Sequence, residues 1–270
     1  WGGKPMRKKQ TNLKTMRTRV YTSLLHVLLA LDAVSAATVA WFSIADNTRV
    51  RTMGLQIIAD PDLRMDLDAH GTIGEYVKTL SFEQIAARIQ KEKGFSMKTT
   101  PLKPVTTSDA KVFTYENGST ASDKSGSYLE FTLHFMAEKD MLVHLTSANS
   151  KDGESDGTAV TSKQEKLPEA MRISFTADGK TRVYNPGMGD TSAAENGLNS
   201  FGLPGAGAMK LSGKNALFSL KEHVDKPVVV RIWMEGTDPA CTDELQQADY
   251  EIRLRFTGET EEENQGAQSE

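Results

Sequence analysis

The sequence predicts an all-β protein: an antiparallel β-sandwich with one short accessory helix, preceded by an N-terminal transmembrane or signal helix. Three observations predict this class. Apolar and polar residues alternate with a period of two through most of the chain after Phe42, as in strands with one buried face. Only one later segment has apolar residues at helical spacing. A basic stretch followed by an apolar one opens the chain.

The first 42 residues have the layout of an export segment. Residues 1–19 form a basic region, and residues 1–20 contain seven bases and no acid. Residues 20–42 are mostly apolar and, as a helix, are long enough to cross a bilayer core of about 30 Å. The positive-inside rule then places residues 43–257, the expected sandwich domain, outside the cytoplasm. Residues 258–270 are expected to form an acidic, disordered tail.

The apolar segment fits either a cleaved signal peptide or a retained anchor. Small residues ending at Ala36 and at Ala40 suit a signal peptidase, which would release the domain. Trp41 and Phe42 suit an aromatic anchor at the membrane surface instead. Asp32 within the segment disfavours a spanning helix by about 2.5–3.5 kcal/mol on insertion scales. The expected location is therefore extracytoplasmic, either secreted or attached to the cell membrane.

Strands are expected wherever apolar residues alternate, and three segments show the alternation clearly: 129–135, 171–175 and 250–256. The run from Val228 to Trp233 is almost continuously apolar, as expected of a central strand covered on both faces. Further strands are expected at 50–58, 110–115, 141–147 and 181–184.

One hairpin and one helix can be placed more closely. A three-residue loop at 138–140 would pair strands 129–136 and 141–147, with Phe135 opposite Val143 and His134 opposite His144. The helix is expected at 81–93, because Ser81 and Gln84 form a capping box ahead of one apolar stripe. This helix would pack across an end or edge of the sandwich.

Charge and cysteine content restrict the classes of partner. Without the first 20 residues the chain carries 25 bases against 36 acids, a net charge of about −11. This acidity argues against nucleic acid as a partner and favours cations or other protein copies. Cys241 is the one cysteine, so an intrachain disulfide is excluded, and no neighbouring base activates its thiol.

A resemblance to a known family appears around the end of the apolar segment. The residues are Thr38-Val39-Ala40-Trp41-Phe42-Ser43-Ile44-Ala45-Asp46-Asn47-Thr48, followed by Met53-Gly54-Leu55-Gln56-Ile57. They resemble the processing-site region of the TasA/camelysin group of exported proteins. The resemblance implies a jelly-roll-like sandwich that builds biofilm-matrix fibres, with the freed N-terminal segment inserted into a neighbouring subunit. As an alternative, it implies a surface metalloprotease activity, which has been described for camelysins. Separately, residues 231–239 look like a segment of uncharacterised clostridial surface proteins.

The sequence offers weak metal-ligand candidates and no catalytic set. The metalloprotease motif HExxH is absent, and the five histidines are scattered. His134 and His144 would form half of a metal site if they faced each other. Carboxylates alternate at Asp152, Glu154 and Asp156 as in a calcium loop, but Lys163 occupies the position of the bidentate Glu. Glu235 and Asp238 flank a turn and form another cation candidate. No resident cofactor is expected, with calcium as the one alternative.

The leading functional hypothesis is a non-catalytic surface or matrix structural protein that self-associates or contacts other surface proteins. In this hypothesis residues 43–50, with Ser43, Ile44 and Val50, form an assembly strand that pairs with another copy. A second hypothesis is a membrane-tethered module, held by the uncleaved N-terminal helix, that binds a glycan, a peptide or a cation. A third is a camelysin-like metalloprotease, which would require zinc.

Overall fold

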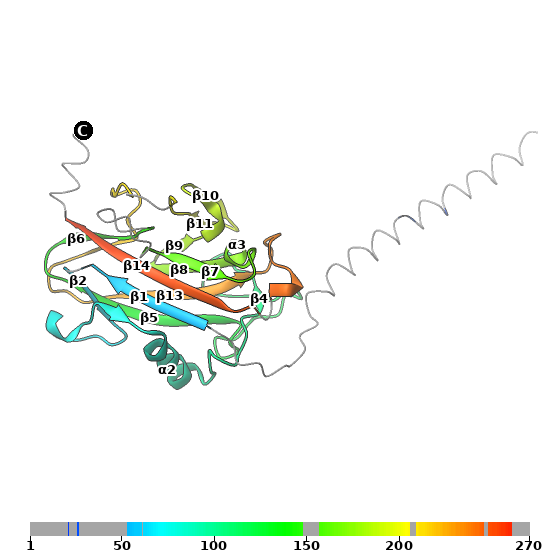
Figure 1. The fold of residues 1–270 in the computed structure, drawn as a ribbon, viewed down its shortest axis with the longest axis horizontal. Coiled ribbons are helices and arrows are strands. Elements are labelled where there is room, and N and C mark those ends of the chain that lie inside the picture. The colour runs from blue at the N-terminus through cyan, green and yellow to red at the C-terminus, as the bar shows by residue number, and fades with distance from the viewer. Residues whose placement is uncertain are drawn as a thin grey trace, which may run out of the picture. The chain divides into compact units, whose positions relative to one another are not determined.

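The computed structural model describes residues 21, 26, 53–60, 62–147, 157–205, 209–245 and 248–260 (Figure 1). The chain divides into two compact units, residues 1–45 and residues 46–270, and every strand named below belongs to the second. The predicted processing residues Ala36 and Ala40 lie outside the described residues. So do Ser43, Ile44 and Val50 of the predicted assembly strand. Among the described residues, no helix is both long and apolar enough to cross a membrane.

The described part of the chain is β-rich and sandwich-like, with two mixed sheets. The six-stranded sheet has the order β12-β6-β14-β1-β3, and β7 also pairs with β14. Its strands are β1 (Met53–Ala59), β3 (Thr79–Leu80), β6 (Met141–Leu145), β7 (Ala159–Ser162), β12 (Phe218–Leu220) and β14 (Tyr250–Thr260). Figure 1 shows β14 running the length of this sheet with β1 beside it.

The eight-stranded sheet has the order β10-β11-β9-β8-β13-β5-β2, and the short β4 also pairs with β13. Its strands are β2 (Leu63–Asp66), β4 (Pro104–Val105), β5 (Tyr128–Ala137), β8 (Met171–Ala177), β9 (Lys180–Tyr184), β10 (Ser192–Glu195), β11 (Leu198–Phe201) and β13 (Lys226–Glu235). The apolar run 228–233 therefore forms a central strand, as predicted, with β5 on one side and β8 on the other.

The main core lies between the two sheets and is rich in phenylalanine. Phe135 of β5 packs against Phe218 of β12 and Phe256 of β14, with ring centroids 5.2 and 5.0 Å apart. Phe175 of β8 meets the same Phe256 edge-on, at 5.6 Å. These contacts join strands of opposite sheets, so the alternating apolar residues predicted to face a core do face one. Burial of such large side chains is the main stabilising contribution in a fold of this kind.

The sheets are mixed, so the prediction of a purely antiparallel sandwich is wrong. β1 runs parallel to β14 over Met53–Ala59, β11 runs parallel to β9, and β4 runs parallel to β13. The alternation of apolar residues has the same period in parallel and antiparallel strands. It therefore predicts which residues form strands and which of them face the core, but it leaves the relative direction of neighbouring strands open.

The predicted hairpin between 129–136 and 141–147 is also wrong. β5 pairs with β2 and β13 in the eight-stranded sheet, whereas β6 pairs with β12 and β14 in the other sheet. The chain crosses from one sheet to the other between Ala137 and Met141. Two strands that face each other across a core present the same matched apolar sides as two strands of a hairpin, so the pattern fits both arrangements.

Residues 110–115 were expected to form a strand and instead belong to a loop over the outer face of the eight-stranded sheet. Only isolated bridges link Thr114 to Thr106 and to Thr120. Ala110 has a φ of 54°, which a regular strand does not accommodate. Ala110 and Phe113 are buried, and Phe113 stacks on Tyr128 with ring centroids 4.1 Å apart, whereas Val112 is exposed. Packing of single side chains onto the sheet face therefore accounts for the apolar residues here, without the hydrogen-bond ladder of a strand.

The helix α2 (Phe82–Lys93) confirms the helix predicted from the capping box. The Ser81 side chain accepts from Gln84 N, the Gln84 side chain accepts from Ser81 N, and Gly94 ends the helix with a φ of 84°. Ile85 and Ile89 are fully buried. The helix contacts β1 and β5, which belong to different sheets, so it covers one open side of the sandwich (Figure 1).

From residue 53 onward, the other helical segments in the described ranges are single turns: η2 (Ile73–Glu75), α3 (Leu167–Ala170), η3 (Pro186–Met188) and η4 (Asp243–Leu245). At the C-terminus β14 continues to Thr260, three residues into the predicted disordered tail. Gly258 to Thr260 pair there with Val143 to Met141 of β6, which explains why this short acidic stretch is ordered.

Candidate functional site

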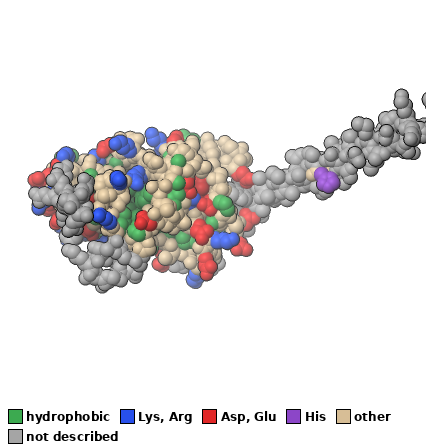
Figure 2. Space-filling view, turned by 90° about the horizontal axis from the view of Figure 1, so that it is seen from above, with side chains coloured by type: hydrophobic (Ala, Val, Ile, Leu, Met, Phe, Trp, Pro, Cys, Tyr) green, Lys and Arg blue, Asp and Glu red, His purple; other side chains and the backbone are tan. Residues whose placement is uncertain are grey.

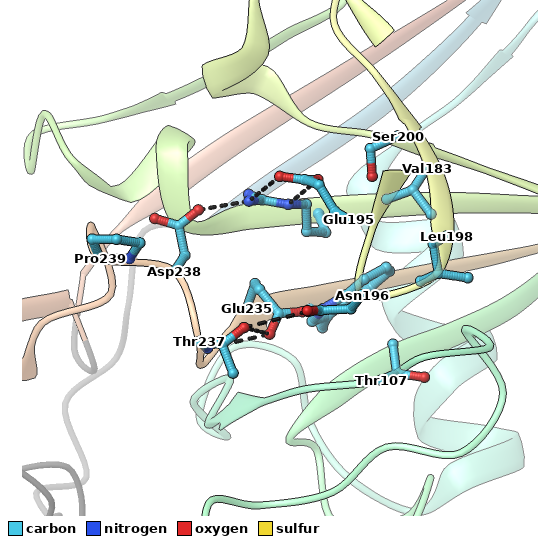
Figure 3. A pocket seen from close by; sticks show the side chains of 12 residues that line it. Thr107, Val183, Glu195, Asn196, Leu198, Ser200, Glu235, Thr237, Asp238 and Pro239 are labelled. Carbon is cyan, nitrogen blue, oxygen red and sulfur yellow. Dashed lines mark hydrogen bonds and ion pairs between the residues drawn. The ribbon is translucent and has the colours of Figure 1, made fainter. Parts of the chain in front are cut away.

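A cavity of about 220 Å³ opens on the outer face of the eight-stranded sheet, next to the loop that follows β13 (Figure 3). Side chains from β8, the β10–β11 hairpin and that loop converge on it. The residues that line it are Thr107, Arg172, Val183, Glu195, Asn196, Leu198, Ser200, Trp233, Glu235, Thr237, Asp238 and Pro239.

The centre of this site is the buried Arg172. Its position on β8, between the inward-facing Met171 and Ile173, directs the side chain to the outer face. Nη2 donates to Glu195 Oε1 at 3.2 Å and to Asp238 Oδ2 at 2.6 Å, and Nε donates to Glu195 Oε2 at 3.3 Å. Nη1 donates to the carbonyl oxygens of Glu169 and Met171. Figure 3 shows Glu195 and Asp238 pointing toward the guanidinium from opposite sides.

Glu235, at the end of β13, is a second buried polar centre in the same cavity. Its Oε2 accepts from Trp233 Nε1 at 3.0 Å. Its Oε1 accepts from the backbone N and the hydroxyl of Thr237, at 3.2 and 2.8 Å. Three donors therefore satisfy a carboxylate that is 5% exposed. The same bonds fix the orientation of the indole and the path of the turn.

A small second core supports the floor of the cavity. Trp233 alternates along β13 with inward-facing residues, so its ring lies on the outer face of the sheet. Phe113 from the covering loop meets this ring edge-on, with centroids 5.3 Å apart. The members of the cluster are Val105, Ala110, Phe113, Ala121, Tyr128, Val183, Leu198 and Trp233. The loop that contains residues 110–115 thus buries the apolar side chains on this face of the sheet, and the polar network lies next to them.

The β10–β11 hairpin supplies Glu195 to the site. Asn196 and Gly197 both have positive φ, 48° and 83°, as a two-residue turn of the I′ type requires. Asn185 Nδ2 also donates to Glu195 Oε1, at 2.9 Å. On the opposite strand, Ser200 is 2% exposed and its hydroxyl has no hydrogen-bond partner among the described residues. Among the described residues of the cavity wall, this hydroxyl is the one buried side-chain polar group without a hydrogen-bond partner.

The structure brings together two of the predicted cation ligands. Glu235 and Asp238 line the same cavity, but other protein groups already bind both carboxylates. Glu235 accepts hydrogen bonds from Trp233 and Thr237. Asp238 accepts them from Arg172 and from the backbone N of Ala240. Within the described ranges, no group of three or more His, Cys, Asp or Glu side chains is arranged to hold a metal ion. Asp152, Glu154 and Asp156 of the predicted calcium loop lie outside those ranges.

The two histidines predicted to face each other are on different sheets. His134 of β5 pairs with Asp225, with Nδ1 2.9 Å from Oδ2, and Tyr76 donates to the same carboxylate. His144 of β6 is fully buried, with Nε2 3.4 Å from Glu259 Oε2. Burial lowers the pKa of His144 to about 4, which outweighs the hydrogen bonds with Asn215 that raise it, so the ring is neutral at neutral pH. The predicted histidine pair is therefore wrong.

Arg172 and Glu195 are the site residues that the sequence analysis missed. Arg172 stands at a polar position of a correctly predicted strand, where an exposed side chain is the ordinary expectation. The Asn196-Gly197 dipeptide is a hairpin signal that could have placed Glu195 on an edge strand. The contact between the two residues joins β8 to β10, which are not neighbours in the sheet.

The arrangement works as a cross-link between three segments. Arg172 binds the β10–β11 hairpin through Glu195 and the loop after β13 through Asp238. Glu235 fixes the turn at the start of that loop through its hydrogen bonds with Thr237. Cys241 lies in the same loop, is buried, and has a pKa raised to about 12 by its burial, so the thiol stays protonated, as expected. The chemistry of the network is therefore that of oriented, hydrogen-bonded ion pairs.

Comparison of the chain with protein-family models, with curated proteins and with solved structures finds no match. The resemblance to the TasA/camelysin group, carried by residues 38–57, therefore stays a prediction.

Proposed function

We propose that this chain is a non-catalytic, exported surface or matrix structural protein whose copies join by strand addition at β10. The observation that carries the proposal is the exposed edge that β10 presents. In the part of the chain that the structure describes, β10 pairs with β11 on one side and with no strand on the other. Ser192, Ala193 and Ala194 are all exposed.

β10 has four residues and carries neither of the residue types that commonly protect edge strands from pairing. Such strands commonly carry Lys or Pro, or are very short or covered. The sequence of β10 is Ser-Ala-Ala-Glu, and its one charge, on Glu195, is bound to Arg172. By contrast, β2 is bridged by Val77, and β3 and β12 have only two and three residues. Arg172 thus holds in place the hairpin whose outer edge is open.

The expected donor is the segment at 43–50, with Ser43, Ile44 and Val50, ahead of β1. The basic-then-apolar order of residues 1–42 supports export, and cleavage near Ala40 would free this segment to reach another copy. The jelly-roll-like winding implied by the family resemblance belongs to the same proposal, and its support is the pair of sheets facing across one aromatic core.

The hydrogen-bond ladder indicates which residue to change. Gly202 N donates to Thr191 O at 2.8 Å, at the base of the hairpin. In an antiparallel pair, bonding alternates along the strand. Thr191, Ala193 and Glu195 therefore bond to β11, whereas the backbone groups of Ser192 and Ala194 point to the open edge.

The test is a proline at the open edge. Ala194→Pro removes an outward N–H and keeps the bonds to β11, so filaments or oligomers of a chain beginning at Ser43 are expected to disappear. Ala194→Ser, which keeps the N–H, is the matched control and should assemble like the parent. Negative-stain microscopy and sedimentation velocity measure the result. A parent that stays monomeric at every ionic strength, or a proline variant that assembles normally, contradicts the proposal.

A further inference from the structure

A second cavity, of about 660 Å³, lies beside the edge strand β12 and the turn between β8 and β9. Three basic side chains line it: Lys180, Arg182 and Lys214. Polar residues and the apolar side chains of Leu142, Leu217 and Phe218 complete the wall. A cavity of this volume falls within the range that proteins use for small-molecule ligands.

Arg182 is the best-fixed of these cations. Its Nη1 donates to Lys214 O at 3.0 Å and to Ala216 O at 2.9 Å, and its guanidinium lies over the Phe201 ring, 4.9 Å from the centroid. Carbonyl oxygens and an aromatic face hold the group in one orientation without cancelling its charge. Among the described residues no carboxylate forms an ion pair with Arg182, and burial alone lowers its pKa. A half-buried arginine without a counter-ion is costly unless an anion joins it.

The charges around Arg182 also favour an anion. Lys180 and Lys214 add two exposed cations to the same cavity. Asp178 is the one acid among the lining residues, and Lys226 Nζ already neutralises it at 2.7 Å. This gathering of positive charge differs from the rest of the domain, which is acidic overall. On the face seen in Figure 2, basic and acidic side chains are interspersed.

We propose that the cavity beside β12 is a binding site for a small organic anion, a carboxylate or phosphate carried on a partly apolar or sugar-like body. The planar guanidinium of Arg182 presents its remaining donors, Nε and Nη2, to the anionic group in the paired geometry that carboxylates and phosphates accept. Lys180 and Lys214 attract the ligand, and the wall of Leu217 and Phe218 contacts its body. The cavity reaches β10 at Ser192, but its three cations lie on other elements, so each proposal has its own variants and can fail alone.

Calorimetry on the full chain in a non-ionic detergent tests the proposal with four probes. D-galacturonate supplies a carboxylate, D-glucose 6-phosphate a phosphate, D-galactose the same body without charge, and inorganic phosphate the charge without a body. At least one of the two charged sugars is expected to bind. The one with the higher affinity indicates whether the site prefers a carboxylate or a phosphate. Their affinity should fall as the NaCl concentration rises from about 50 to 200 mM.

Two variants connect binding to the cavity. Lys180→Gln/Lys214→Gln changes only exposed side chains, so the fold is kept and the affinity is expected to fall about tenfold or more. Arg182→Gln retains an amide donor for the carbonyls of Lys214 and Ala216 and should abolish binding. The matched control is Lys111→Gln/Lys124→Gln, which removes two exposed charges outside the cavity.

The outcomes separate cleanly. Binding by a charged sugar that the lysine pair variant weakens and the control leaves unchanged supports the site. No heat with either charged sugar, equal binding of D-galactose, or an equal loss in the control overturns it. If inorganic phosphate binds as tightly as D-glucose 6-phosphate, the body of the ligand adds no affinity, and that part of the proposal is wrong.

Discussion

Arg172 shows how one buried charge can organise segments that lie far apart in the chain. The Arg172 side chain is 5% exposed, while those of Glu195 and Asp238 are 31% and 17% exposed. An ion pair in this position brings no large net stability compared with apolar residues, because desolvation opposes the attraction. It does fix geometry, since a guanidinium deprived of its partners would be buried without compensation. Specificity of the hairpin and loop positions is therefore its main effect.

Replacing Arg172 with methionine tests this role at the level of one side chain. Arg172→Met keeps an unbranched apolar stem but removes the guanidinium, which leaves two carboxylates facing each other without a counter-charge. The free energy of unfolding is expected to fall by about 3 kcal/mol, the lower end for a broken buried pair because both carboxylates reach solvent. Urea unfolding followed by far-UV circular dichroism measures the change.

The matched control is Arg88→Met on α2. It breaks the ion pairs of Arg88 with Asp68 and Glu92, which are more exposed than those of Arg172. It should cost less than about 1 kcal/mol. Adding Glu195→Gln and Asp238→Asn to Arg172→Met should recover part of the loss, because the unpaired charges are removed. Equal losses for Arg172→Met and Arg88→Met would show that the buried network has no special role.

At the scale of elements, the sequence predicts where single strands and helices lie, but it does not predict which elements pair with one another. The capping box at Ser81 and the alternation in β8 and β14 are local signals, and both are confirmed. The pairing of β5 with β6 is wrong, because matched apolar faces occur across a core as well as within a hairpin. Arg172 was missed for the same reason, since its partners come from other elements.

The base of the β10–β11 hairpin depends on a close approach of two backbone segments. A Cβ at Gly202 would lie 1.7 Å from Gly189 O and 2.7 Å from Gly189 C, which are backbone atoms that cannot turn aside. This approach places Gly202 N against Thr191 O at the start of β10. The position of the open edge is thus fixed at one end by Gly202 and at the other by the Arg172–Glu195 pair.

Gly202→Ala is therefore expected to displace the hairpin and lower the free energy of unfolding by about 2 kcal/mol or more. Gly205→Ala is the matched control, because a Cβ there would meet nothing within 4 Å. Hydrogen exchange of the β10 and β11 amides, together with urea unfolding, measures the two effects. A Gly202→Ala protein with unchanged protection in these strands would show that the segments can separate without loss.

At the scale of the whole molecule, β6 and β7 act as two halves of one strand, with residues 148–156 inserted between them. Both run antiparallel to β14, with Leu145 opposite Phe256 and Ala159 opposite Arg253. Between them Thr158 N donates to Thr146 O at 2.8 Å, which closes the neck of the insertion. Thr146 N donates in turn to Arg255 O, so the ladder passes the insertion almost without a break.

Replacing residues 148–156 with Asn-Gly should therefore leave the sandwich intact. The closed neck needs only a short turn, and shortening the loop slightly lowers the entropy cost of closing it, so stability is expected to change by about 1 kcal/mol or less. Urea unfolding measures this, and a chain that no longer folds would show that the insertion supports the sheet.

The variant also lacks Asp152, Glu154 and Asp156. If these carboxylates bind calcium, the parent alone will gain thermal stability when calcium is added.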